Sequence, residues 1–295
     1  MLIAIITGRW NEVSLCVAAT SKFQLLELCE FIMARLKTAK LSGEQFKLFQ
    51  QVVREFDFGV VRSIQRDSTM VYLTYQSDAM EAATKEISRK EICESLIYIL
   101  SKIVPQETTN REEEKAWKKF CGSDESVRFW RLIESIFTQV QKWAKAIKGK
   151  SVARNAIYRL LAVILGFARN ATRDTFADSI LRSIIGTFKG HELFLILRDF
   201  LSYLKFSDVT PFSLSESLAT LLDVIVDQLI LPVGEVVTSE TSDLLVDLGI
   251  DIGHLALPQA AKLVCSYLEH DDLSVKYIGA SILRDVAMEI GRAHV

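Results

Sequence analysis

Few side chains in this 295-residue sequence are spaced so that they could hold a metal or activate a nucleophile. Asp271-Asp272 begins the Asp-Asp-x-x-Asp cluster with which isoprenoid synthases hold magnesium, but Val275 stands at the third carboxylate position. Because that ligand is missing, we expect the pair to cap a helix, where an Asp side chain accepts hydrogen bonds from free backbone amides. His191-Glu192 begins a zinc-protease HExxH string, but the second histidine is absent.

Three aspartates form the most regular acidic group. Asp243, Asp247 and Asp251 are four residues apart, so a helix would stack them along one face. A metal site could be built on such a face, but a solvated face or a dock for a basic partner requires fewer assumptions. We therefore predict an acidic surface at these three residues.

The sequence contains no dinucleotide-binding, P-loop, zinc-protease or nucleophile-elbow motif. The cysteines form no CxxC pair, which favours reduced thiols in the cytosol or nucleus. We predict that the chain is not an enzyme and has no catalytic residue, cofactor or metal. The five cysteines are Cys16, Cys29, Cys93, Cys121 and Cys265.

Charge is strongly segregated along the chain, although the formal net charge is only −2. Residues 135–173 contain eight basic residues and no acidic one, whereas residues 206–272 contain twelve acidic residues and one basic residue, Lys262. The basic stretch could bind phosphate or an acidic peptide, and the acidic stretch a basic motif. The alternative is that ordinary solvent faces are segregated by chance. The candidate basic surface comprises Lys142, Lys145, Lys148, Lys150 and Arg154.

The elements that must position these residues are helices. Over residues 127–148 the apolar side chains recur at helical spacing, with Trp143 on the apolar face, so we expect Trp143 to pack in a core rather than stack on nucleic acid. Residues 69–75 could form a strand, but a single strand has no pairing partner, so we expect a helix or an irregular connector there. Similar helical patterns cover residues 22–38, 43–56, 88–104, 151–169, 175–188, 192–205, 214–231 and 258–268.

Helix boundaries recur with a period of about 40 residues, as in HEAT and armadillo arrays. The major breaks are separated by 44, 41, 42 and 39 residues, and most intervals contain a second, softer break. These major breaks lie at Pro105, Gly149, Gly190, Pro232 and Asp271. Capping boxes, in which a Ser or Thr is followed three residues later by Glu or Gln, begin at Ser42, Ser88, Thr109 and Ser213.

One local pattern occurs twice. Residues 124–129 and 272–277 share the order Asp-x-Ser-Val-basic-aromatic, in which Asp or Ser would cap a helix and Val would begin its buried stripe. With the two-helix pattern of residues 258–287, the chain resembles the HEAT/armadillo repeat family. The resemblance implies an all-α, right-handed α-solenoid of about seven antiparallel helix pairs. It also implies packing roles for Ala280, Leu283 and Ala287.

We expect one helical-repeat domain over residues 1–289, less regular in residues 1–104. The last six residues, 290–295, resemble the translation of a sequencing adapter, which indicates a non-native tail. On that interpretation the chain is a fragment of a longer array.

Three classes of function follow. The favoured one is a non-enzymatic scaffold or adaptor that binds other proteins in a cytoplasmic or nuclear complex. No membrane span is expected, because the apolar run 160–168 is about half the ~20 residues that a span requires. The alternative is a nucleic-acid-associated repeat protein, in ribosome assembly or chromosome organisation, that uses residues 135–173. The third class, a helical enzyme, would need a convergent polar site.

Overall fold

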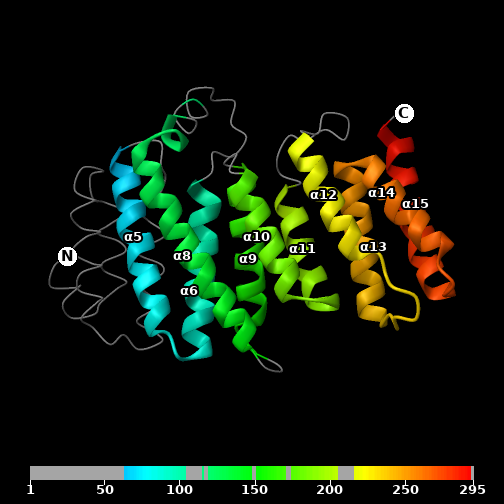
Figure 1. Ribbon diagram of the computed structural model, residues 1–295, viewed down its shortest axis with the longest axis horizontal. Coiled ribbons are helices and arrows are strands. Elements are labelled where there is room, and N and C mark those ends of the chain that lie inside the picture. Colours follow the sequence, from blue (N-terminus) through cyan, green and yellow to red (C-terminus); the bar gives the residue numbers. More distant parts are fainter. Residues whose placement is uncertain are drawn as a thin grey trace. The chain divides into compact units, whose positions relative to one another are not determined.

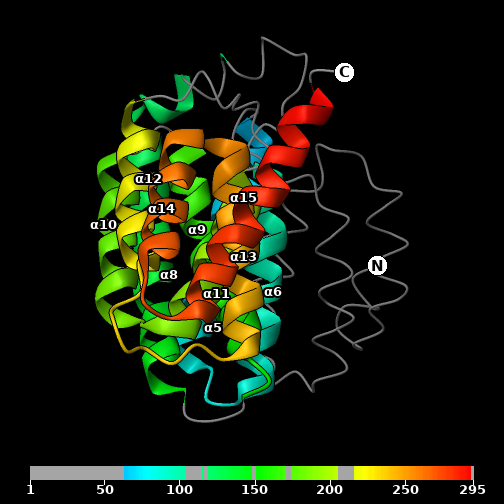
Figure 2. The same cartoon turned by 90° about the vertical axis from the view of Figure 1, so that its right-hand side faces the viewer.

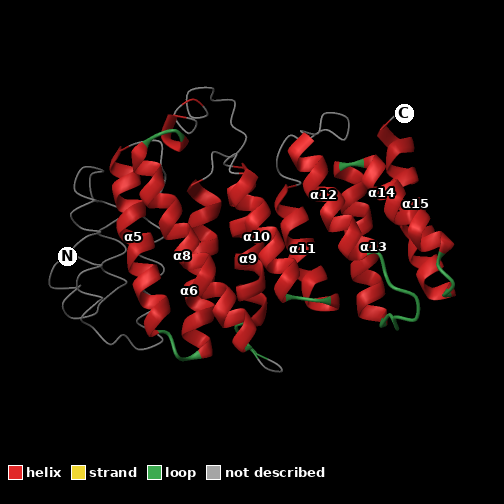
Figure 3. Cartoon of the chain, in the orientation of Figure 1, coloured by secondary structure: helices red, strands yellow, loops and turns green. Residues whose placement is uncertain are grey.

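The computed structural model describes residues 63–103, 115, 119–147, 151–170, 174–204 and 216–293. Within these residues all regular structure is helical and no strand occurs (Figure 3). The predicted all-α fold is therefore confirmed, and residues 69–75 lie inside a helix. The helices predicted at 22–38 and 43–56, and the Ser or Thr that begins the capping boxes at Ser42, Thr109 and Ser213, lie outside the described residues.

The chain divides into two compact units, Met1–Ile164 and Leu165–Val295. The described helices of the first unit are α5 (Ser63–Ala82), α6 (Glu86–Ile103) and α8 (Asp124–Ala146). Helix α9 (Arg154–Asn170) begins in the first unit and ends in the second. The second unit continues with α10 (Asp174–Thr187), α11 (Gly190–Leu204), α12 (Glu216–Leu229), α13 (Ser239–Leu255), α14 (Leu257–Glu269) and α15 (Leu273–Ala293).

In the first unit, α5 packs against both α6 and α8. Helix α8 is amphipathic, as predicted: its buried stripe includes Phe129, Ile133, Val140 and Trp143. Four cations of this helix are exposed, namely Arg128, Arg131, Lys142 and Lys145. Trp143 is 4% exposed, which confirms the predicted core position. Rings meet edge to face at this core: Phe129 lies 5.7 Å from Phe120 and 5.4 Å from Trp130, measured between centroids.

In the second unit the helices alternate between two rows. Helix α10 packs against α12 and α12 against α14, while α11 packs against α13 and α13 against α15. Figures 1 and 2 show these two rows, with α10, α12 and α14 on one side of the unit and α11, α13 and α15 on the other. Helix α14 also packs against α13 and α15, so the rows share a core. Each helix thus contacts the one that follows two places later.

Glycines let helices of one row approach closely. A Cβ added to Gly249 of α13 would overlap Ile282 of α15, and one added to Gly253 would overlap Val286. One of the softer breaks expected from the sequence lies at residues 253–257, and the structure confirms it: α13 ends at Leu255 and the break is at Ala256, with Gly253 still inside the helix. Gly253 therefore serves close helix packing, since it has no side chain to hold the helices apart.

The capping box predicted at Ser88 is wrong. Helix α6 begins at Glu86, so Ser88 lies inside its first turn and is not the residue that caps it. An acidic residue in the first turn, here Glu86, is favoured by the positive end of the helix dipole. Helix α6 therefore starts two residues before Ser88, the residue that the capping-box pattern predicted as its cap.

The two copies of the Asp-x-Ser-Val pattern differ in register. Asp272 caps α15 as predicted, because its carboxylate accepts the backbone N–H two residues later at 2.7 Å. In the other copy Asp124 is already the first residue of α8, and Ser123 precedes the helix. One residue rotates a helix by about 100°. Val275 is accordingly buried, but Val127 is exposed, so the prediction that both valines begin a buried stripe is wrong for Val127.

The packing roles expected on α15 are not found among the described residues. Ala280, Leu283 and Ala287 are all exposed. The side of α15 that does pack carries Val275, Ile278 and Ile282. The resemblance thus predicted packing on the face of α15 that is exposed. Small or apolar residues recur at helical spacing on both faces, so the pattern alone did not distinguish them.

Candidate functional site

The candidate basic surface is only partly described. Lys142 and Lys145 are exposed on α8, Arg154 is half-buried at the start of α9, and Lys148 and Lys150 lie outside the described residues. Of the three described cations, only Lys142 and Lys145 are exposed to solvent. What remains is a pair of lysines three residues apart on the outer face of α8.

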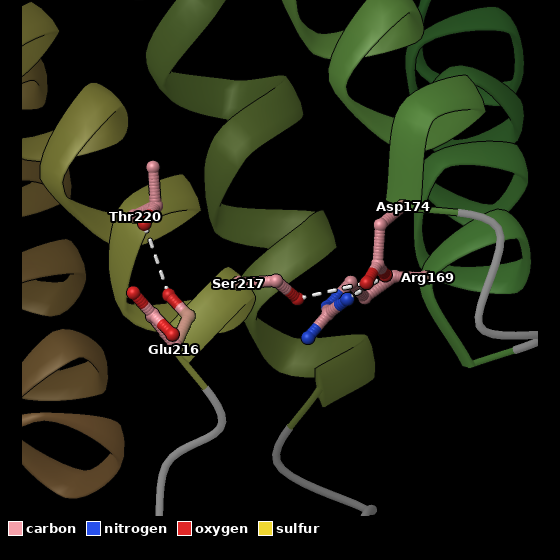
Figure 4. Close-up of polar contacts among 5 residues, drawn as sticks. All are labelled: Arg169, Asp174, Glu216, Ser217 and Thr220. Carbon is pink, nitrogen blue, oxygen red and sulfur yellow. Dashed lines mark hydrogen bonds and ion pairs between the residues drawn. The ribbon is translucent and has the colours of Figure 1, made fainter.

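One member of the basic stretch has a structural role. Arg169, near the end of α9, forms an ion pair with Asp174, the first residue of α10, and its side chain is only 12% exposed. The Ser217 hydroxyl of α12 donates to the other oxygen of Asp174 at 3.0 Å (Figure 4). In the same view the Thr220 hydroxyl donates to the backbone carbonyl of Glu216. Arg169 thus stabilises the α9–α10 connection and its contact with α12.

An open groove of about 400 Å³ lies over α5 and α8 in the first unit. Its lining combines hydroxyl, carboxylate and cationic groups without a histidine or a cysteine. Since most of these side chains are exposed, the groove suits a weakly held polar chain rather than an enclosed substrate. The lining residues are Ser77 and Glu81 of α5, and Arg131, Glu134, Ser135, Thr138, Gln139 and Lys142 of α8.

The candidate acidic surface is smaller than predicted. Asp243 and Asp247 are exposed on α13, but Asp251 is buried, with 8% of its surface exposed. A step of four residues advances the helix by about 40°, so two steps turn the third side chain by about 80° toward the core. Identical spacing therefore does not give identical exposure, and the surface carries two carboxylates.

Two other aspartates, Asp223 and Asp227 of α12, have partners on α14. The Gln259 amide donates to Asp223 at 3.2 Å and the Lys262 ammonium to Asp227 at 2.8 Å. That hydrogen bond raises the pKa of Lys262. These pairs were not predicted from the sequence, although Lys262 stands out there as the single basic residue of an acidic stretch.

Two histidines of the second unit, His191 and His270, form contacts within the fold. His191, in the first turn of α11, lies with Nδ1 3.2 Å from the Thr241 hydroxyl of α13. His270 is buried, and its Nδ1 accepts a hydrogen bond from the backbone N–H of Asp272 at 3.1 Å. Across the described ranges, no three histidine, cysteine or acidic side chains lie together as metal ligands would.

No helix in the described part of the chain combines the length and the apolar character needed to cross a bilayer. Searches of protein-family models, of curated proteins and of solved structures return no match to this chain.

Proposed function

We propose that this chain is a non-enzymatic helical-repeat protein that acts as a scaffold or adaptor and binds other proteins within a larger complex. The observation that carries the proposal is the regular way in which the second unit joins its helices. Asp174 of α10 contacts Ser217 of α12, 43 residues later, and Asp223 of α12 contacts Gln259 of α14, 36 residues later. In the other row, His191 and Thr241 are 50 residues apart. These separations, from 36 to 50 residues, lie on either side of the ~40-residue period of HEAT and armadillo arrays.

The proposed architecture is a right-handed α-solenoid of antiparallel helix pairs. In such an array each pair buries its apolar face only by stacking on its neighbours, which leaves long outer surfaces for partners. The absence of catalytic motifs from the sequence supports a binding role. The scattered cysteines, with no CxxC pair, favour action in the cytosol or nucleus.

A pull-down with the full chain as bait tests the proposal. We expect specific proteins to be retained, and the charge reversals Lys142→Glu and Lys145→Glu together to release those that bind the face of α8. The matched control reverses Lys85 and Lys90, two other exposed lysines of the first unit. If no protein is retained by any form of the chain, the proposed function is wrong. If the two double variants behave alike, the α8 face is not a docking site.

The second candidate function is nucleic-acid binding through the basic stretch. The exposed cations of α8 favour it, but Glu125 and Glu134 are exposed on the same helix and weaken the local positive potential. A salt titration of RNA and DNA binding decides between the two. Phosphate contacts are strongest at low ionic strength, so a chain that binds neither nucleic acid there does not have this function.

A further inference from the structure

Half of the exposed large apolar side chains gather at one end of the second unit. The described residues contain twelve such side chains, and six of them belong to the α12–α13 and α14–α15 connections or to the helix ends beside these. Four are strongly exposed: Val233 by 78%, Val236 by 89%, Leu273 by 79% and Tyr277 by 69%. The apolar end, as we call this group, consists of Ile230, Val233, Val236, Leu268, Leu273 and Tyr277.

A hydrogen bond places the two connections side by side. The buried hydroxyl of Tyr267, near the end of α14, donates to the backbone carbonyl of Leu229, the last residue of α12, at 2.7 Å. Burial raises the pKa of Tyr267, and the negative charge of Glu235 in the α12–α13 connection raises it further. Figure 3 shows both connections at the same end of their helices. The six apolar side chains thus belong to one region.

The backbone that carries these side chains is fixed by local hydrogen bonds. The Glu235 N–H donates to the Pro232 carbonyl at 3.2 Å, which closes a tight turn with Val233 at its corner. Gly234 has a φ of +88°, the left-handed conformation that such a turn requires at its third position. In the other connection, His270 and Asp272 hold the turn before α15. A partner that covers this end therefore meets a preorganised surface, so less chain entropy is lost on binding.

The rim of the apolar end is acidic. Glu235, Glu269, Asp271 and Asp272 are exposed, and each lies within two residues of an apolar side chain of this group. Lys276, close in sequence, is half-buried. The ion pairs recorded among the described residues of this unit join other groups: Arg169 with Asp174, Arg198 with Asp199, Lys262 with Asp227, and Arg284 with Asp285. The rim therefore presents negative charge to whatever covers the apolar side chains.

We propose that the apolar end docks a basic amphipathic segment of another protein, with apolar side chains against the six residues and Lys or Arg against the acidic rim. The proposal rests on the proposed function and names the class of partner. Contiguous apolar surface with a polar rim is typical of interaction sites. The acidic rim opposes contact with the same end of a second copy of this chain, and with a nucleic acid, because either would bring negative charge against negative charge.

Binding of a defined peptide to the full chain tests the proposal. The probe is an amphipathic peptide of about 14 residues made of leucine and lysine at helical spacing, about four turns long. Its counterpart has glutamate in place of every lysine. We expect the lysine peptide to bind more tightly at low salt and the glutamate peptide to bind at least tenfold more weakly, since opposite charge favours association and like charge opposes it.

Variants locate the binding. Val233→Ser with Val236→Ser removes two of the most exposed apolar groups of the apolar end, so we expect about a tenfold loss of affinity for the lysine peptide. The matched control, Val127→Ser with Val152→Ser, removes two exposed valines from the first unit and should keep the affinity. The proposal is overturned if both double variants bind alike, if the glutamate peptide binds as well, or if the wild-type chain forms a dimer that Val233→Ser with Val236→Ser abolishes. Each of these outcomes leaves the pull-down test of the proposed function unaffected.

Discussion

The two units join their helices by different means. In the first unit, aromatic rings and a cation add to the aliphatic core: Arg89 of α6 lies 5.5 Å from the ring centroid of Trp143 on α8. In the second unit, glycines admit branched side chains from the next helix of the row, and single polar contacts connect neighbours. Rings fill irregular volumes that need not recur, whereas the contacts of the second unit recur at similar sequence separations. The second unit therefore carries the evidence for a repeat.

The largest effect is expected in the ring core of the first unit. Trp143→Ala should lower the free energy of unfolding by about 3–5 kcal/mol, because a large buried side chain is replaced by a cavity. Urea denaturation followed by circular dichroism measures the loss. Trp143→Phe, which keeps a ring at this position, should cost clearly less. Equal losses for the two variants would show that a ring at this position does not stabilise the unit.

A smaller loss of stability is expected where a glycine lets two helices of one row approach closely. Gly249→Val should destabilise the second unit by about 3 kcal/mol, because the new side chain overlaps Ile282 and the core must shift. The same substitution at Gly186 is the control, since a Cβ there has no atom within 4 Å. All four tryptophans precede residue 144, so their fluorescence follows the first unit while circular dichroism follows the whole chain. If the two variants are equally stable, glycine-mediated packing is not important in this unit.

The hydrogen bond between α12 and α14 should contribute less to the free energy of unfolding than the packing at Gly249. Tyr267→Phe removes the hydroxyl that donates to Leu229 and should cost about 1 kcal/mol, the usual net contribution of one hydrogen bond. Tyr277→Phe provides the comparison, because the Tyr277 side chain is exposed. Thermal unfolding of both variants gives the difference. A Tyr267→Phe protein as stable as Tyr277→Phe would mean that this contact does not hold the two connections together.

The effect of alkaline pH should be similar in the two units. Burial raises the pKa of Tyr75 in the first unit and of Tyr203 in the second to about 12. The unfolded chain then releases these protons at a lower pH than the folded chain, near the ordinary value of 10. The stability that both phenols contribute is complete below pH 10 and is lost as the pH rises toward 12. Denaturation at a series of pH values checks this, and a stability that rises over this interval would contradict the two pKa shifts.

The sequence predicted the helices well where apolar periodicity is strong. The amphipathic pattern of residues 127–148 corresponds to α8, and residues 192–205 correspond to α11 within two residues at each end. Boundaries were harder to predict, because the signals that mark them have several uses. Gly253 resembles a helix break but serves close packing, and Ser88 resembles a cap but lies inside α6.

Surfaces were less predictable than helices. Spacing placed Asp251 with Asp243 and Asp247, but helix rotation carries Asp251 into the core. The apolar end was not predicted at all, because its side chains come from two connections that are more than 30 residues apart in sequence. Only tertiary contacts such as that of Tyr267 with Leu229 bring them together. A local pattern such as Pro232-Val233-Gly234 indicates a turn, but it does not show which other connection lies next to that turn in the folded chain.

Hydrogen–deuterium exchange of the full chain, with and without the leucine–lysine peptide, tests the central claim that the second unit carries a protein-binding surface at its apolar end. We predict slower exchange at residues 230–238 and 268–277 when the peptide is present, and unchanged exchange along α8. Protection of α8 without protection of the two connections would contradict the claim, and would place the binding surface in the first unit instead.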